Sequence, residues 1–140
     1  MFRYLILCLF ITTTSTDVFS KEHPATNSPI LISITVNAGG GATVSGHTYL
    51  LDNLHTALQT KMWNKYLSTG KMQDKFKLRF SGEVLMGVRG ASMDEILLSQ
   101  TNTLKKLCMK KYGKEFDQLS TARQTYIKTK FPILFQTTYT

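Results

Sequence analysis

The sequence predicts an α+β fold in two layers, in which a small sheet of four or five strands carries two amphipathic helices on one face, with a short membrane segment in front. Three observations lead to this prediction. β-Branched residues alternate over residues 30–36, two stripes of apolar residues at helical spacing follow later in the chain, and glycines or prolines separate these segments. A mixture of strand and amphipathic helix patterns in a chain of this length is typical of one α+β domain.

The N-terminal residues 1–20 contain a run without charged side chains between Arg3 and Asp17. Its members include Tyr4, Leu7, Phe10, Thr12, Thr13 and Thr14. The thirteen uncharged residues span about 20 Å as a helix, whereas a hydrocarbon core is roughly 30 Å thick. The run therefore indicates either a secretory signal peptide or a partial membrane helix that has lost its front end. Both interpretations place the rest of the chain on the far side of a membrane.

The main domain is expected to begin after a linker. Residues 21–29 contain two prolines and mostly polar side chains, which predicts an extended tether. The domain then covers residues 30–140. Its first strand is predicted at residues 30–36, with Ile30, Ile32, Ile34 and Val36 on one face.

Short strands and a helix are predicted next. A glycine turn at residues 39–41 leads to a second strand at residues 42–45, and residues 48–50 form a short extended piece. Apolar residues at steps of three and four predict a helix over residues 51–67. Asp52 is expected to act as its N-cap or first-turn acid, and His55 is expected to be solvated.

Two further strands are predicted in the middle of the chain. Phe76, Leu78 and Phe80 alternate with Lys77 and Arg79, which predicts a half-buried strand with a basic outer face. The apolar run at residues 83–88 is interpreted as a central strand.

The second long helix is expected to begin near Ser92 as its cap, with Asp94 and Glu95 in its first turn. Its inner face is predicted to contain Ile96, Leu97, Leu104, Leu107 and Cys108. Tyr112-Gly113 is typical of a helix C-terminus.

The C-terminal part is predicted to contain a short helix over residues 121–130. Thr121 and Gln124 are expected to be its capping pair, and Pro132 is expected to end it. Residues 133–135 are interpreted as a last edge strand.

The net charge of +8 is concentrated in residues 61–140, which hold fifteen Lys and Arg against six Asp and Glu. A solvated basic surface is the simplest interpretation, and attraction to an anionic membrane or wall is the second. Nucleic acid is not an expected partner, because the aromatic residues do not alternate with the lysines in a binding motif. Cys108 is the only cysteine after residue 20, so no internal disulfide is expected.

The residues do not indicate an enzyme. His23, His47 and His55 do not pair with each other or with a cysteine at metal-ligand spacing, and no nucleophile motif is present. We therefore predict no catalytic residue, cofactor or metal ligand. An enzyme with an unfamiliar site remains a weaker hypothesis.

Several short patterns along the chain, taken together in their order, resemble the ExbD/TolR family of biopolymer transport proteins, in particular its Bacteroidetes-type members. Residues 4–17 resemble the second half of that family's single membrane helix. Residues 32–38, the glycine turn, Ser45-Gly46 and residues 51–54 resemble the start of its periplasmic domain. Residues 111–120, followed by Ile127 and Phe131-Pro132, resemble the C-terminal extension of those members.

The resemblance implies a non-enzymatic, single-pass subunit of the inner membrane, with its main domain in the periplasm. It would belong to a proton-motive-force-driven complex for TonB-dependent energy transduction. The implied partners are a second copy in a homodimer, an ExbB/TolQ-like membrane subunit and a TonB/TolA-like protein. The family's proton-relay aspartate, near the start of the membrane helix, has no counterpart before Asp17. The chain is therefore expected to be truncated at its N-terminus or to work without the relay.

The partner surface is predicted at the edge of the first strand, at Ile30, Ile32, Ile34 and Val36, because an exposed edge can accept an added strand. The opposing interpretation is that this strand is fully paired. The alternative function is a secreted basic binding module that acts at the cell envelope.

Overall fold

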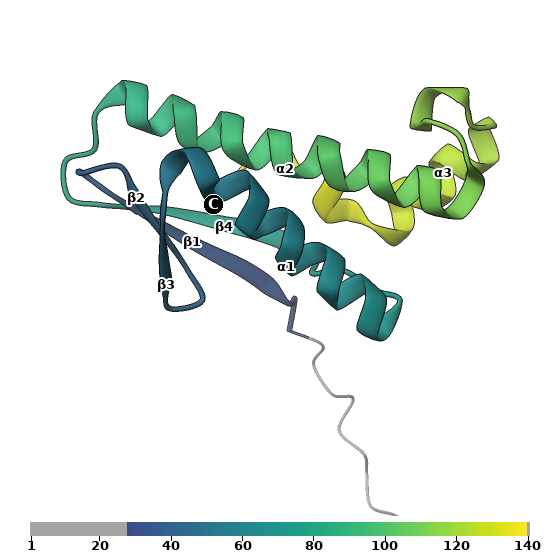
Figure 1. Ribbon diagram of the computed structural model, residues 1–140, viewed down its shortest axis with the longest axis horizontal. Helices are drawn as coiled ribbons and strands as arrows, with labels where there is room; N and C mark the ends of the chain where they lie inside the picture. Colours follow the sequence, from purple (N-terminus) through teal and green to yellow (C-terminus); the bar gives the residue numbers. More distant parts are fainter. Residues whose placement is uncertain (1–27, 140) are drawn as a thin grey trace, which may run out of the picture.

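The computed structural model describes residues 28–139, and these residues form an α+β domain (Figure 1). The elements are β1 (Leu31–Asn37), β2 (Gly41–Val44), β3 (His47–Leu50), η1 (Leu51–Asn53), α1 (Leu54–Thr69), β4 (Lys75–Ser81), α2 (Met86–Tyr112), η2 (Phe116–Gln118), α3 (Thr121–Lys130) and η3 (Pro132–Phe135). The predicted fold class is confirmed: a four-stranded sheet forms one layer, and α1 and α2 lie over one of its faces.

The predicted membrane segment lies outside the described residues, as do Tyr4, Leu7, Phe10 and the three threonines within it. Within residues 28–139, no helix is both long and apolar enough to cross a bilayer.

The strand order of the sheet is β3-β2-β1-β4. β1 pairs with β2 in antiparallel fashion and with β4 in parallel, so both of its edges are occupied. The prediction that β1 offers a free edge is therefore wrong. The strands at the two edges of the sheet are β3 and β4.

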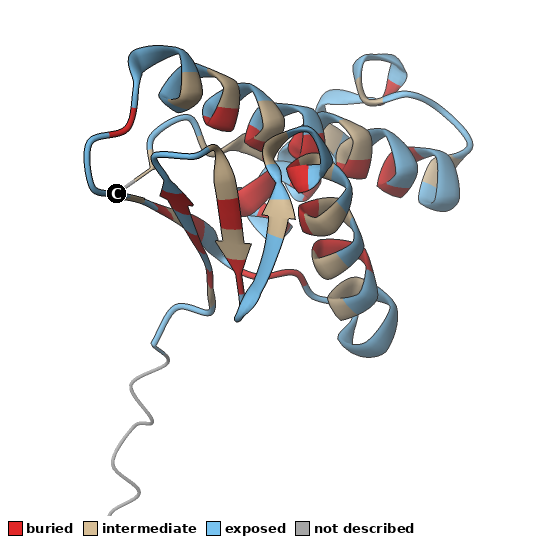
Figure 2. Cartoon of the chain, turned by 60° about the vertical axis from the view of Figure 1, so that its left-hand side comes forward, coloured by how far each residue is buried: buried red, intermediate tan, exposed pale blue. Residues whose placement is uncertain are grey.

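Buried residues alternate with exposed ones along β1 (Figure 2). Ile32, Ile34 and Val36 of β1 point toward the helices and are fully buried. Ser33 and Thr35 lie on the opposite face and are exposed. The predicted alternation along this strand is thus confirmed, and it agrees with a sheet that, within residues 28–139, has helices on one side only.

The helix α1 confirms the predicted apolar stripe, because Leu54, Leu58, Met62 and Trp63 are all buried. Gly70 ends this helix in the left-handed conformation with φ of 68°, which is typical of a glycine that follows a helix. Asp52 lies in η1 and does not cap α1 through its side chain.

The predicted strand at residues 83–88 is wrong, because α2 begins at Met86. Leu85 is extended and precedes the helix. Only Val84 of this apolar run is buried, whereas Leu85 and Met86 are 73% and 82% exposed. A short apolar run does not distinguish a strand from the start of a helix by its pattern. Here most of the run faces solvent.

Because α2 begins earlier than predicted, Ser92, Asp94 and Glu95 lie inside the helix and not at its start. Ser92 is buried, and its hydroxyl donates a hydrogen bond to the carbonyl of Val88 one turn earlier. Leu97 is exposed, which contradicts its assignment to the inner face.

The buried stripe of α2 is partly polar. It consists of Ser92, Ile96, Ser99, Gln100, Thr103, Leu107 and Cys108. These positions follow the helical period, and Leu97 lies one position away from them. The hydroxyls of Ser99 and Thr103 donate to carbonyls of their own helix, at 2.6 and 2.7 Å, so burial leaves them satisfied.

The side chain of Gln100 holds the C-terminal segment against α2. Its Nε2 donates to the carbonyl of Ile133 at 2.7 Å and to that of Gln136 at 3.0 Å. Residues 133–135 form part of the 3-10 turn η3, and the predicted edge strand at this position is wrong. Ile133 and Leu134 are buried in the same core.

The helix α3 occupies its predicted residues, but its start is stabilised differently. Ser120 is the N-cap residue. Gln124 does not pair with Thr121; its Nε2 donates to the carbonyls of Phe116 and Leu119, at 3.1 and 3.2 Å. These bonds connect α3 to the turn η2 that precedes it. Leu119 is buried in the core, and Phe116 packs against it.

We expect Gln100→Leu to lower the free energy of unfolding by about 2 kcal/mol, because two carbonyls in a mostly buried place lose their donor. Urea unfolding of the full chain measures this loss. Thr101→Ala, on the exposed side of the same helix, should change stability by less than about 0.5 kcal/mol. Equal losses in both variants would show that the Gln100 bonds do not anchor the segment.

Burial raises the pKa of the Cys108 thiol, so the neutral form predominates at neutral pH. Because the thiolate is the reactive form, a maleimide should label Cys108 only slowly in the folded protein and rapidly in urea. The measurement uses a Cys8→Ser background and mass spectrometry. Fast labelling without denaturant would contradict the buried position of this side chain.

Candidate functional site

The strand β4 forms an edge of the sheet, and a side chain from the C-terminal segment covers its beginning. The N–H of Phe76 donates to Oε1 of Gln136 at 2.7 Å, and Nε2 of Gln136 donates back to the carbonyl of Phe76 at 3.0 Å. The ring of Tyr139 packs edge-on against that of Phe76. The amide of Gln136 thus pairs with the strand as one peptide group of a neighbouring strand would.

Beyond Phe76 this edge is open. Alternate residues of a paired strand direct their amide groups to the same side. Leu78 and Phe80 therefore direct their N–H and C=O groups away from β1, as Phe76 does. Within residues 28–139, β4 has no strand neighbour other than β1. The free groups can accept an extended segment from another protein.

The side chains beside this edge carry positive charge. Lys75 and Arg79 are exposed and Lys77 is half-buried, all on the sheet face away from the helices. Charged side chains on an edge strand oppose pairing between identical copies, and three cations favour an acidic segment as the guest. The other edge strand, β3, is shorter, with four residues against seven in β4.

The residues predicted to bind a partner are not brought together at a surface. Ile32, Ile34 and Val36 are fully buried and cannot contact another protein. Ile30 is about half exposed, and it precedes β1. The open edge at Leu78 and Phe80 was missed because strand order is not encoded in local patterning. The alternating basic residues of β4 were the one feature of the sequence that could have indicated an edge strand.

The prediction that His55 is solvated is wrong. Its backbone N–H and its ring Nδ1 both contact Oε2 of Glu95, at 3.0 and 2.6 Å, and both side chains are mostly shielded from solvent. The pair joins the first turn of α1 to α2. Within the described chain, no hydroxyl or thiol is hydrogen-bonded to His55.

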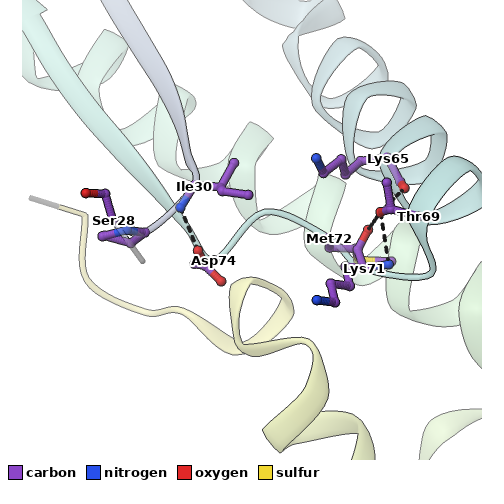
Figure 3. A pocket seen from close by; sticks show the side chains of 8 residues that line it. Ser28, Ile30, Lys65, Thr69, Lys71, Met72 and Asp74 are labelled. Atoms are coloured by element: carbon purple, nitrogen blue, oxygen red, sulfur yellow. Dashed lines mark hydrogen bonds between the residues drawn. The ribbon is translucent and has the colours of Figure 1, made fainter. Parts of the chain in front are cut away.

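A cleft of about 670 Å³ lies where the chain enters the domain (Figure 3). It is lined by Ser28, Pro29, Ile30, Lys65, Thr69, Lys71, Met72 and Asp74. Asp74 fixes one wall, because its Oδ2 accepts from the N–H of Ile30 at 2.6 Å and its own N–H donates to the Ile30 carbonyl at 2.8 Å.

The opposite wall of the cleft belongs to the end of α1 and the loop after it. The hydroxyl of Thr69 donates to the carbonyl of Lys65 at 2.8 Å, and it also bridges to the backbone of Lys71. These bonds fix the backbone from which both lysine side chains extend.

The open edge makes a specific prediction for hydrogen exchange in the full chain. The amides of Leu78 and Phe80 should exchange quickly, whereas those of Lys77 and Arg79, which face β1, should be protected. Phe76 should be protected by Gln136 and should lose this protection in Gln136→Ala. Gln118→Ala, at the distant turn η2, is the control and should leave Phe76 unchanged. Slow exchange at Leu78 and Phe80 would mean that this edge is covered.

No site for a metal is formed by the described residues, since no three His, Cys, Asp or Glu side chains among residues 28–139 gather closely enough to hold an ion. Comparison of the chain with protein-family models, with curated proteins and with solved structures gave no significant match.

Proposed function

We propose that this chain is a non-enzymatic ExbD/TolR-like subunit of a proton-motive-force-driven biopolymer transport complex. The observation that carries the proposal is the open edge of β4 at Leu78 and Phe80. A domain that transmits movement must hold another protein without changing it chemically, and an unpaired strand edge does this through backbone hydrogen bonds. The ordered set of short sequence patterns supports the same family.

In this proposal the guest is an extended segment of a TonB/TolA-like protein. It pairs with the N–H and C=O groups of Leu78 and Phe80, and Gln136 prevents pairing from extending past Phe76. The cations of Lys75, Lys77 and Arg79 attract acidic side chains of the guest. Several parallel hydrogen bonds share a load applied along the strand, which suits a mechanical coupling.

The remaining parts of the proposal come from the N-terminal sequence and from the family resemblance. Residues 1–20 attach the domain to the inner membrane beside an ExbB/TolQ-like subunit, with the domain in the periplasm and a second copy as partner. No acidic residue precedes Asp17, so we assign the proton relay to no residue of this chain. A buried acid in a membrane is costly and is retained for such a relay.

The alternative function is a secreted basic binding module. It is favoured by the charge of residues 102–131, which contain eight Lys and Arg and only two acids. Sequencing the N-terminus of the purified protein separates the two functions. A start at Lys21 indicates secretion, and an uncleaved chain that requires detergent indicates the anchor.

The strand-addition hypothesis is tested with a photo-crosslinking residue in place of Lys77 in the full chain, in cells that express the TonB-like and ExbB-like proteins. We expect capture of the TonB-like protein. The same probe at Thr48, on the other edge strand, should capture about tenfold less, because the hydrogen-bonded segment lies at β4.

Phe80→Pro and Phe80→Ala form a matched pair for this test. Both remove the ring, but only proline removes the outward N–H that a guest would use, and it leaves the ladder to β1 intact. We expect Phe80→Pro to reduce capture strongly and Phe80→Ala to retain most of it. Circular dichroism verifies that both fold. Equal capture in the two variants, or no capture from Lys77, would contradict the proposal.

A further inference from the structure

The cleft beside the start of β1 carries opposite charges on its two walls (Figure 3). Lys65 and Lys71 extend from the α1 side toward the side that holds Ile30 and Asp74. The apolar side chain of Met72 also lines the space. The arrangement is therefore dipolar, with two ammonium groups facing a carboxylate.

These charges are not neutralised inside the domain. Within residues 28–139, neither Lys65 nor Lys71 forms an ion pair, although Lys105 does so with Glu115. Neither lysine lies over an aromatic ring, in contrast to Lys106, which lies over Trp63. Asp74 uses Oδ2 for the Ile30 N–H. Its Oδ1 has no hydrogen bond within the described chain, so it can accept one from a ligand.

A ligand that matches both walls has an anionic group and a cationic group on one short chain. A plain phosphate would satisfy the lysines but would be repelled by Asp74. A phosphoethanolamine group places its phosphate at Lys65 and Lys71 and can donate from its primary ammonium to Asp74, in charge-assisted hydrogen bonds. A cleft of about 670 Å³ lies within the usual range for small-molecule sites.

The position of the cleft indicates the source of this group. Ser28 and Pro29, which line it, are the last two residues of the predicted linker from the membrane segment. Eleven residues, 17–27, separate the predicted membrane segment from the cleft and can span at most about 40 Å, so in a membrane-attached chain the cleft lies within about 40 Å of the headgroups. Ile30, about half exposed at the rim, and Pro29 offer apolar contact to the glycerol region of a lipid.

We propose that this cleft binds the phosphoethanolamine headgroup of a membrane lipid, with Lys65 and Lys71 on the phosphate and Asp74 on the ammonium group. The inference rests on the membrane attachment in the proposed function and is independent of the partner at β4. A bound headgroup would fix the orientation of the domain on the bilayer surface.

The test uses the full chain with ¹³C-methyl methionine in maltoside micelles. The methyl group of Met72 reports on the cleft, and that of Met109, on the exposed side of α2, is the internal control. The probes are phosphoethanolamine, phosphocholine, glycerol 3-phosphate and inorganic phosphate. We expect phosphoethanolamine to shift the Met72 signal at about tenfold lower concentration than the other three.

Three variants test which charged side chain of the cleft binds which group of the ligand. Lys65→Gln and Lys71→Gln should each weaken the response to phosphoethanolamine about tenfold. Asp74→Asn keeps an acceptor for the Ile30 N–H but loses the charge, so phosphoethanolamine and glycerol 3-phosphate should become equivalent. Lys110→Gln, on an exposed part of α2, should have no effect.

A second experiment, in bilayers, distinguishes whether the ligand is a lipid headgroup or a free metabolite. In nanodiscs, the Met72 shift should appear when phosphatidylethanolamine is present and be absent in pure phosphatidylcholine. An unmoved Met72 signal, an equal response to all four soluble probes, or a response to the soluble group without one in nanodiscs would each overturn the proposal. None of these outcomes bears on cross-linking at β4, so failure here and failure of the proposed function are separate results.

Discussion

Gln100 makes the interaction on which the arrangement of the C-terminal half depends. It is a polar side chain in the buried stripe of α2, and its amide donates to two carbonyls of the last segment. That segment in turn presents the side chain of Gln136 to the edge of β4. The side chains of Gln100 and Gln136 thus connect, through the C-terminal segment, the core of the helical layer to the edge of the sheet. Because a buried amide without partners is costly, these contacts favour one position of the segment.

The second constraint is that the helices of the described part of the chain cover only one face of the sheet. The inward residues of β1 are fully buried, and the outward residues of β1 and β4 are polar or basic. The domain therefore exposes a sheet face, two strand edges and the cleft at the start of β1. The edge of β4 and the cleft combine unpaired backbone or charged groups with a fixed surrounding geometry. This is why they are the two candidate binding places.

Much of the fold could be predicted from local patterns. The alternation in β1 and β4, the stripe of α1 and the glycine after α2 each depend on residues close in sequence, and the structure confirms them. The errors arose where distant groups decide the outcome. Val84 to Val88 carries an apolar composition that fits strand or helix, and its exposure depends on how α2 lies over the sheet. Residues 133–135 form a turn, and the carbonyl of Ile133 within it accepts a hydrogen bond from Gln100, more than thirty residues away.

The candidate site was less predictable for the same reason. Ile30 to Val36 was a reasonable place for a partner only if β1 lay at the edge, and strand order places β4 there. His55 was assigned to solvent because its partner, Glu95, lies 40 residues away on another helix. The cleft joins residues from the start of β1, the end of α1 and the loop before β4, which no single window of sequence brings together.

The side chain of Gln136 occupies the length of a single peptide group on β4, at the end where that strand begins. An incoming segment consequently meets a fixed stop on one side and free space on the other. It cannot slip by two residues toward the stop without displacing the side-chain amide of Gln136, whose main-chain carbonyl accepts a hydrogen bond from Gln100 of α2. Gln136 would therefore set the register of any strand that docks at this edge, and it would also set the direction in which that strand can dissociate.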